Sequence, residues 1–104
     1  MEHYDYARLT ATSFGIDINI TDDAELKALM TELNKLHPQM SVSNIDRLPG
    51  GEVFYCRIKE LGGKDSAYLW WIVKYLCRRG WEPLGAVSVT AQGVWEQLRR
   101  KTSD

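Results

Sequence analysis

Residues 66–79 read SAYLWWIVKYLCRR, and no other stretch of the chain constrains the fold as strongly. At about 100° per residue, a helix over these positions places Leu69, Val73 and Leu76 on one side, as a stripe that would face a core. The residues on the flanks of this stripe are Trp70, Ile72 and Cys77. Asp65 or Ser66 is expected to cap the start of the helix, and Gly80 is expected to end it.

The same helix carries a second apolar band beside the core stripe. The band comprises Tyr68, Trp71 and Tyr75 and continues to Arg79, so that only a narrow strip of the helix remains polar. Two interpretations are open: the aromatic side chains pack against another helix or the terminal strand, or they form an exposed binding face. Three aromatic side chains that are half uncovered would expose roughly 225 to 375 Å², which is near the patch limit of an ordinary monomer.

Another helix is expected over residues 24–37, and it is amphipathic in the ordinary way. Asp22 is placed to cap its start, with Glu25 three residues later on the side away from the apolar stripe, and Pro38 prevents its continuation. Its single apolar stripe comprises Leu26, Leu29, Met30, Leu33 and Leu36. This helix has no second band, so the band at 68–79 is a specific feature of the other helix.

The remaining segments have the alternation of strands. Residues 4–12 place Ala7, Leu9 and Ala11 on one face, and 14–20 place Phe14 and three isoleucines on one face, either as one bent strand or as a pair. Residues 40–48 and 52–60 predict a hairpin closed by a type II turn at Pro49-Gly50-Gly51. A strand is expected over 84–90, followed by a turn at 91–93 and a last strand over 94–101, for which a short helix is the alternative.

This order of elements predicts one α+β domain over residues 1–104. Strand, helix, strand occurs twice, with additional strands at both ends, which is typical of a ferredoxin-like arrangement of two split βαβ units. An antiparallel sheet with both helices on one face is therefore expected.

Residues 67–89 include LCRRGWEPLGAV at 76–87, where the helix leads into the next strand. This segment resembles a signature of small uncharacterised bacterial domains, in which a helix, Gly-Trp-Glu, an apolar strand and a closing strand follow one another. Pro83 stands where those domains usually have an aliphatic residue. The resemblance implies a local fold and carries no activity.

Composition restricts the class of protein. Apolar residues at 44% and charged residues at 26% are typical of a globular domain. The longest apolar run, at 67–73, is far shorter than the roughly 20 residues of a membrane span, and the N-terminus lacks the pattern of a secretory signal. A cytoplasmic location without membrane association is therefore expected, with Cys56 and Cys77 as separate thiols.

Charge is segregated along the sequence. Residues 1–52 hold nine acids and four bases, whereas 53–104 hold five acids and nine bases. Folding can either keep these charges apart as two surfaces or bring them together.

Chemical motifs are mostly absent. His3 and His37 are the only histidines. We expect His37 to stabilise the C-terminal end of its helix electrostatically rather than to act in catalysis. A catalytic pair of His37 with Cys56 stays open. Metal-ligand spacings are missing, and Gly62-Gly63-Lys64 is followed by Asp65 where a phosphate-binding loop needs Ser or Thr. No cofactor or metal is expected.

The sequence therefore favours a non-catalytic protein-interaction or regulatory module that binds a protein partner or a second copy. The expected partner-binding residues are Tyr68, Trp71, Lys74, Tyr75, Arg78 and Arg79. The same bases and rings could instead hold nucleic acid, with Arg99-Arg100-Lys101 extending the basic surface, although the net charge of −1 argues against it. A small enzyme of unrecognised type is the third interpretation.

Overall fold

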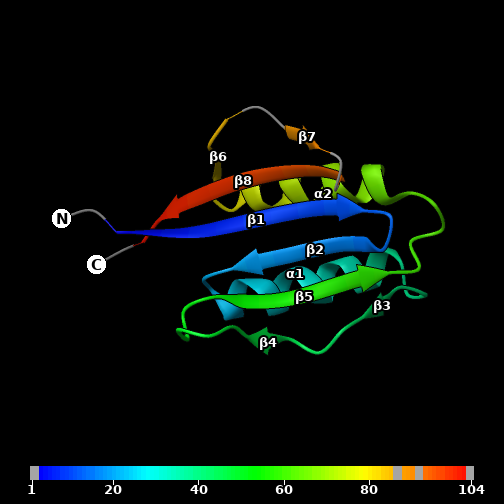
Figure 1. Cartoon of the computed structure of the whole chain (residues 1–104), viewed down its shortest axis with the longest axis horizontal. Helices are drawn as coiled ribbons and strands as arrows, with labels where there is room; N and C mark the ends of the chain where they lie inside the picture. Colours follow the sequence, from blue (N-terminus) through cyan, green and yellow to red (C-terminus); the bar gives the residue numbers. More distant parts are fainter. Residues whose placement is uncertain (1–2, 86–87, 91–92, 103–104) are drawn as a thin grey trace.

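A computed structural model of the chain describes residues 3–85, 88–90 and 93–102, and in these residues two helices lie on one face of an antiparallel sheet (Figure 1). The helices are α1 (Asp23–Leu36) and α2 (Asp65–Arg78). The strands are β1 (Tyr4–Thr12), β2 (Gly15–Ile20), β3 (Ser41–Val42), β4 (Asp46–Arg47), β5 (Phe54–Lys59), β6 (Glu82–Pro83), β7 (Ser88–Thr90) and β8 (Gly93–Lys101).

The strand order is β3-β5-β2-β1-β8-β6, with β4 also paired to β5 and β7 to β8. In Figure 1 the sheet faces the viewer, with α1 behind β2 and β5 and α2 behind β1 and β8. The α+β class and the antiparallel sheet agree with the sequence-based prediction. No helix of the described residues lies on the opposite face of the sheet, and we call it the open face.

The connections on either side of α1 and α2 show how far the two strand–helix–strand segments resemble each other. α1 leads from β2 to β3, and β5 lies between these two strands in the sheet. α2 leads from β5 to β6, but β2, β1 and β8 all lie between them. The second half departs from the expected order because β1, joined to β2 by a short turn, occupies the position beside β2.

The register of the strands explains the core. Ala7 pairs with Ile20 and Leu9 with Ile18, so the apolar side chains of neighbouring strands point to the same face. That face packs against Leu69, Ile72 and Leu76 of α2 and Leu26, Leu29 and Leu33 of α1, all buried. The expected core stripe of α2 is therefore confirmed, and so is that of α1 except for Leu36. This last residue of α1 was expected on the apolar stripe but is 51% exposed.

β1 and β2 are a pair rather than one bent strand, and Gly15 allows β2 to approach β5 closely. Its φ is +128°, and a Cβ there would lie 2.2 Å from the carbonyl oxygen of Ile58. Phe14, expected on the apolar face of the strand, instead lies in the turn and is 68% exposed. The turn takes Phe14 out of the alternation because the backbone N–H of Phe14 donates to Thr12 Oγ1.

The predicted hairpin at Pro49-Gly50-Gly51 is confirmed. Gly51 N–H donates to the Leu48 carbonyl at 3.0 Å and Gly50 has φ +98°, as a type II turn requires. The strand before the turn is shorter than expected, because residues 43–45 separate β3 from β4. Ser43 Oγ there accepts from the Arg57 N–H at 2.8 Å.

The ends of the helices follow mostly from local sequence. Asp22 accepts from the Glu25 N–H, as predicted. Lys64, not Asp65 or Ser66, is the cap of α2, and it makes no side-chain capping bond. After α2 the Trp81 N–H donates to the Leu76 carbonyl and the Gly80 N–H to Cys77, a Schellman motif in which Gly80 has φ +92°.

Part of the C-terminal region lies outside the described residues. These are Ala86 and Val87 of the strand expected over 84–90, and Ala91 and Gln92 of the expected turn. Of the strand expected over 84–90, Ser88–Thr90 form β7, whereas Leu84 and Gly85 lie outside any strand and β6 precedes them at Glu82–Pro83. The last segment is strand β8 rather than a helix. Among the helices that the structure describes, neither is long and apolar enough to cross a membrane.

We predict that Gly15→Ala lowers the free energy of unfolding by about 3 kcal/mol, because the Cβ meets backbone and the φ is unfavourable for a side chain. Gly62→Ala is the control: it also has positive φ, but a Cβ there meets nothing within 4 Å, so about 1 kcal/mol is expected. Chemical denaturation measures both. Equal losses would contradict a steric role for Gly15.

Candidate functional site

The aromatic band of α2 has partners inside the molecule. The Tyr68 hydroxyl lies 3.0 Å from Nδ1 of His37, and Nε2 of His37 lies 3.0 Å from the carbonyl oxygen of Glu60. A carbonyl can only accept, so Nε2 of His37 carries a proton and donates to Glu60. His37 therefore ties the end of α1 to α2 and to the loop after β5.

Farther along the band, Trp71 and Tyr75 stack with ring centroids 5.5 Å apart. The guanidinium of Arg79 lies over the Tyr75 ring at 5.7 Å and also binds Glu25 of α1. Tyr68, Trp71 and Tyr75 are half-buried and pack against the core. Of the two interpretations of the band, internal packing accounts for these contacts.

The exposed aromatic side chain of α2 is a different one. Trp70 was expected on a flank of the core stripe, but 54% of its surface is exposed. Lys74, Cys77 and Arg78 beside it are exposed as well. We call these four residues the outward stripe. Both flanks of the core stripe are apolar, but α1 covers only the Tyr68 flank, which leaves Trp70 and Cys77 uncovered.

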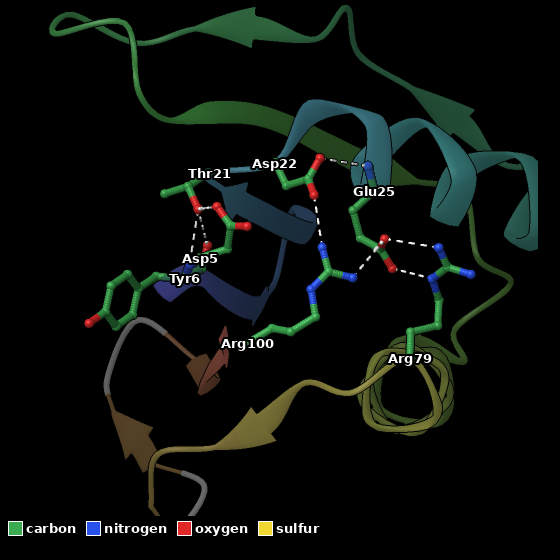
Figure 2. A network of polar contacts seen from close by, with 7 residues as sticks. All are labelled: Asp5, Tyr6, Thr21, Asp22, Glu25, Arg79 and Arg100. Atoms are coloured by element: carbon green, nitrogen blue, oxygen red, sulfur yellow. Dashed lines mark hydrogen bonds and ion pairs between the residues drawn. The ribbon is translucent and has the colours of Figure 1, made fainter. Parts of the chain in front are cut away.

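Glu25 joins the two helices and β8 (Figure 2). Its carboxylate accepts from Arg79 Nε and from Arg79 Nη2, the latter at 3.1 Å, and from Arg100 Nη1 at 3.2 Å. Arg100 also donates to Asp22 Oδ2 at 2.8 Å. Although Glu25 was expected outside the apolar stripe of α1, its side chain is 4% exposed. The four side chains form one charged network.

The charged network lowers the pKa of Glu25. Burial alone would raise the pKa, but the hydrogen bonds and positive charges of Arg79 and Arg100 outweigh it and hold the pKa of the Glu25 carboxyl below its ordinary value. Glu96 is the opposite case. It is 3% exposed, its Oε1 has no hydrogen-bond partner among the described residues, and burial raises its pKa.

The open face of the sheet is hollowed. A cavity of about 460 Å³ crosses β2, β1 and β8. Gln97 pairs with Arg8 and Arg8 with Asn19, which sets these three side chains in one row on the open face. Tyr6 and Thr21 stand beside the row, and Leu84 and Val53 close its ends. The backbone of Ala7, Ile20 and Leu98, whose side chains point into the core, forms the floor.

Sequence reasoning did not find this hollow. The polar alternation of residues 4–12 was its signal, because Tyr6, Arg8 and Thr10 had to lie on the face away from the core. The remaining information, that Asn19 and Gln97 stand on either side of Arg8, depends on the pairing of β1 with β2 and β8.

The candidate catalytic residues Cys56 and His37 are not hydrogen-bonded to each other in the described contacts. Cys56 is buried, and burial, with the nearby charge of Asp17, raises the pKa of its thiol to about 11. Both nitrogens of His37 are engaged in hydrogen bonds. Asp17, one of the acids near the start of α1, is bound by Arg57 at 2.6 Å. In the described part of the chain, no three His, Cys, Asp or Glu side chains are grouped as metal ligands.

Comparison of the chain with known protein families, with curated proteins and with solved structures finds no match. The resemblance of residues 67–89 to small bacterial domains therefore stays a prediction. The geometry gives its Gly-Trp-Glu local roles: Gly80 ends α2, Trp81 is buried beneath Arg100, and Glu82 binds Arg99 at 2.7 Å.

We predict opposite effects on stability for the two buried glutamates. The folded pKa of Glu25 is depressed, so its contribution is present above the unfolded pKa and is lost as the pH falls through the lower folded value. Glu25→Gln should lower the free energy of unfolding at pH 7 by about 1 to 3 kcal/mol. The difference from wild type should shrink toward acidic pH.

For Glu96 the folded pKa is raised, so ionisation disfavours the folded state once the pH exceeds the unfolded pKa. Glu96→Gln should therefore stabilise the protein at pH 7 and match wild type below the unfolded pKa. Denaturant titrations at several pH values measure both variants. Destabilisation by Glu96→Gln at pH 7 would show that its carboxylate has a favourable partner.

We predict that Trp71→Ala lowers the free energy of unfolding by about 2 kcal/mol, because it removes a half-buried ring stacked on Tyr75. Trp70→Ala is the matched control on the same helix, with an expected change within about 0.5 kcal/mol. Thermal and denaturant unfolding compare them. A larger loss for Trp70→Ala would contradict the assignment of Trp71 to the interior.

Proposed function

We propose that this protein is a non-catalytic interaction module that binds a protein partner through the outward stripe of α2. One observation carries the proposal: Trp70 is more than half exposed while the aromatic band on the other flank of α2 has partners within the molecule. Trp and Arg are enriched among the residues that dominate binding energy at protein interfaces. The stripe presents Trp70 with Lys74, Arg78 and the exposed Cys77 beside it.

The charge of the stripe favours a partner with acidic groups. Lys74 and Arg78 are both exposed, and the outward stripe contains no acid. Two copies docked through the same stripe would bring four bases together, which costs free energy through like-charge repulsion. A different protein, with carboxylates around an apolar recess for Trp70, fits this surface better than a second copy.

The six residues predicted from sequence thus divide into two groups. Lys74 and Arg78 belong to the proposed interface. Tyr68, Trp71 and Tyr75 position α2 against the core, and Arg79 binds Glu25. This division also weakens the nucleic-acid interpretation of α2, because rings packed against the core offer less surface for stacking bases.

A non-catalytic role is supported by the state of the candidate catalytic groups. A thiol with a pKa of about 11 is protonated at neutral pH and is a poor nucleophile. We also propose a cytoplasmic location, which suits two free cysteines, and a ferredoxin-like relationship for the part formed by β2, α1, β3 and β5.

We predict that affinity purification from the native cell recovers proteins whose binding depends on Trp70. Trp70→Ala should reduce their recovery at least tenfold, because it removes the central anchor of the stripe. Leu36→Ala is the matched control, since Leu36 is an exposed apolar side chain of α1 (51%) outside the stripe. Recovery is measured by quantitative mass spectrometry.

The recovered partner then allows a direct test with Cys77. Cys56 is buried and Cys77 is exposed, so a thiol reagent reports on the stripe alone. Saturating partner should slow the alkylation of Cys77 in the wild type and leave it unchanged in Trp70→Ala. Partners whose recovery is the same with both variants, or that leave Cys77 reactive, would refute the proposal.

A further inference from the structure

The hollow on the open face lies on the opposite side of the sheet from α2, and the outward stripe does not use it. We propose that this hollow binds a nucleoside phosphate, either free or as one unit of a single strand. The inference depends on the charge, the aromatic surface, the amide groups and the size of the hollow.

Arg8 is the group that would bind the phosphate. Among the described residues that line the hollow, Arg8 is the only charged one. With the Gln97 amide oriented so that its oxygen faces Arg8, that oxygen accepts from Arg8 Nε at 3.2 Å and from Nη2 at 3.1 Å. A planar guanidinium held in one orientation is suited to bind a phosphate or a carboxylate with two hydrogen bonds.

The surroundings of Arg8 also favour an anion. By strand register, the described charged side chains on the open face are five bases and three acids. The bases are Arg8, Arg57, Lys59, Arg99 and Lys101, and the acids are Asp17, Asp46 and Glu82. Asp17 is bound by Arg57 and Glu82 by Arg99, so two of these acids are already compensated.

The rest of the hollow suits a nucleobase. The Tyr6 side chain is 48% exposed, and its ring stands at the wall of the hollow with the Tyr4 ring 6.4 Å away. Exposed aromatic rings on an open sheet are the surface on which proteins stack bases. Asn19 adds a carboxamide group, which can form paired hydrogen bonds with a base edge, and Gln97 retains its amide nitrogen as a donor.

Size separates a nucleotide from a simple ion. About 460 Å³ is much larger than an inorganic phosphate needs and lies within the usual range of small-molecule sites. Val53 and Leu84 close the ends of the hollow with apolar surface, as a base or a sugar would require.

The wall at Tyr6 is held in place before any ligand binds. Thr21 Oγ1 accepts from the Tyr6 N–H at 2.9 Å and donates to Asp5 Oδ1 at 2.8 Å, while the Tyr6 ring points away from these contacts (Figure 2). A preformed site loses less conformational freedom on binding than a flexible one.

The test is calorimetric titration of the purified chain with adenosine monophosphate, with adenosine, and with an eight-nucleotide single-stranded oligodeoxyadenylate at low and high salt. We expect saturable binding of the phosphate-bearing probes, at least tenfold weaker binding of adenosine, and weakening by salt. Arg8→Gln should weaken binding at least tenfold. Lys35→Gln removes one positive charge from an exposed position of α1, on the other side of the sheet, and should leave binding unchanged.

The two sources of the ligand give different results, and both support the proposal. A free nucleotide is indicated if the monophosphate binds as tightly as the oligonucleotide. A single strand is indicated if only the oligonucleotide binds, with dependence on Arg8. No binding of any probe at low salt, or equal binding by wild type and Arg8→Gln, would overturn the proposal.

Wild-type protein provides a measurement that does not depend on the folding of a variant. Titration followed by amide NMR shifts should perturb Tyr6, Arg8, Asn19 and Gln97, with little change at the outward stripe. Perturbation centred on α1 or α2 instead would also overturn the assignment of the site.

Discussion

The buried carboxylate of Glu25 holds together parts of the chain that are far apart in sequence. It joins the first turn of α1 to Arg79 at the end of α2 and to Arg100 on β8. Removing one partner of a buried charge leaves the other without compensation, so these groups stabilise the fold as a set. Arg100 also covers the ring of Trp81, which connects the network to the buried residue after α2. The relative placement of both helices depends on this network.

That placement determines which surfaces remain available. Because α1 and α2 share one face of the sheet and contact each other at both ends, Tyr68 and Arg79 point toward α1. In the part of the chain that the structure describes, no second helix lies on the opposite flank of α2, and Trp70 is exposed there. On the open face of the sheet, alternate strand positions present polar and aromatic side chains to the surface. Arg8 is one of them, and it lines the hollow. The two proposed binding surfaces are therefore consequences of placing both helices on one side.

The charge segregation in the sequence does not persist as two surfaces. Acids of the first half meet bases of the second: Asp22 and Glu25 bind Arg100, and Asp17 binds Arg57. An acidic half and a basic half attract each other at short range, where burial reduces screening by solvent. The acids and bases that are separated along the sequence therefore largely pair with one another where their helices and strands meet in the fold.

The sequence by itself determined the two helices, most of the strands, the type II turn at Gly50 and most of the core, because period and turn chemistry are local properties. It placed Phe14 and Leu36 on core faces, and both are exposed in the structure. It also indicated that α2 is apolar on more than one side. Only the tertiary structure decided which flank of α2 is covered, since Tyr68 and Trp70 are equivalent on an isolated helix and differ only in the neighbour they face. The tertiary structure also decided the partners of Arg8 and Glu25. Their partners come from strand pairing and helix placement, which join positions separated by most of the chain.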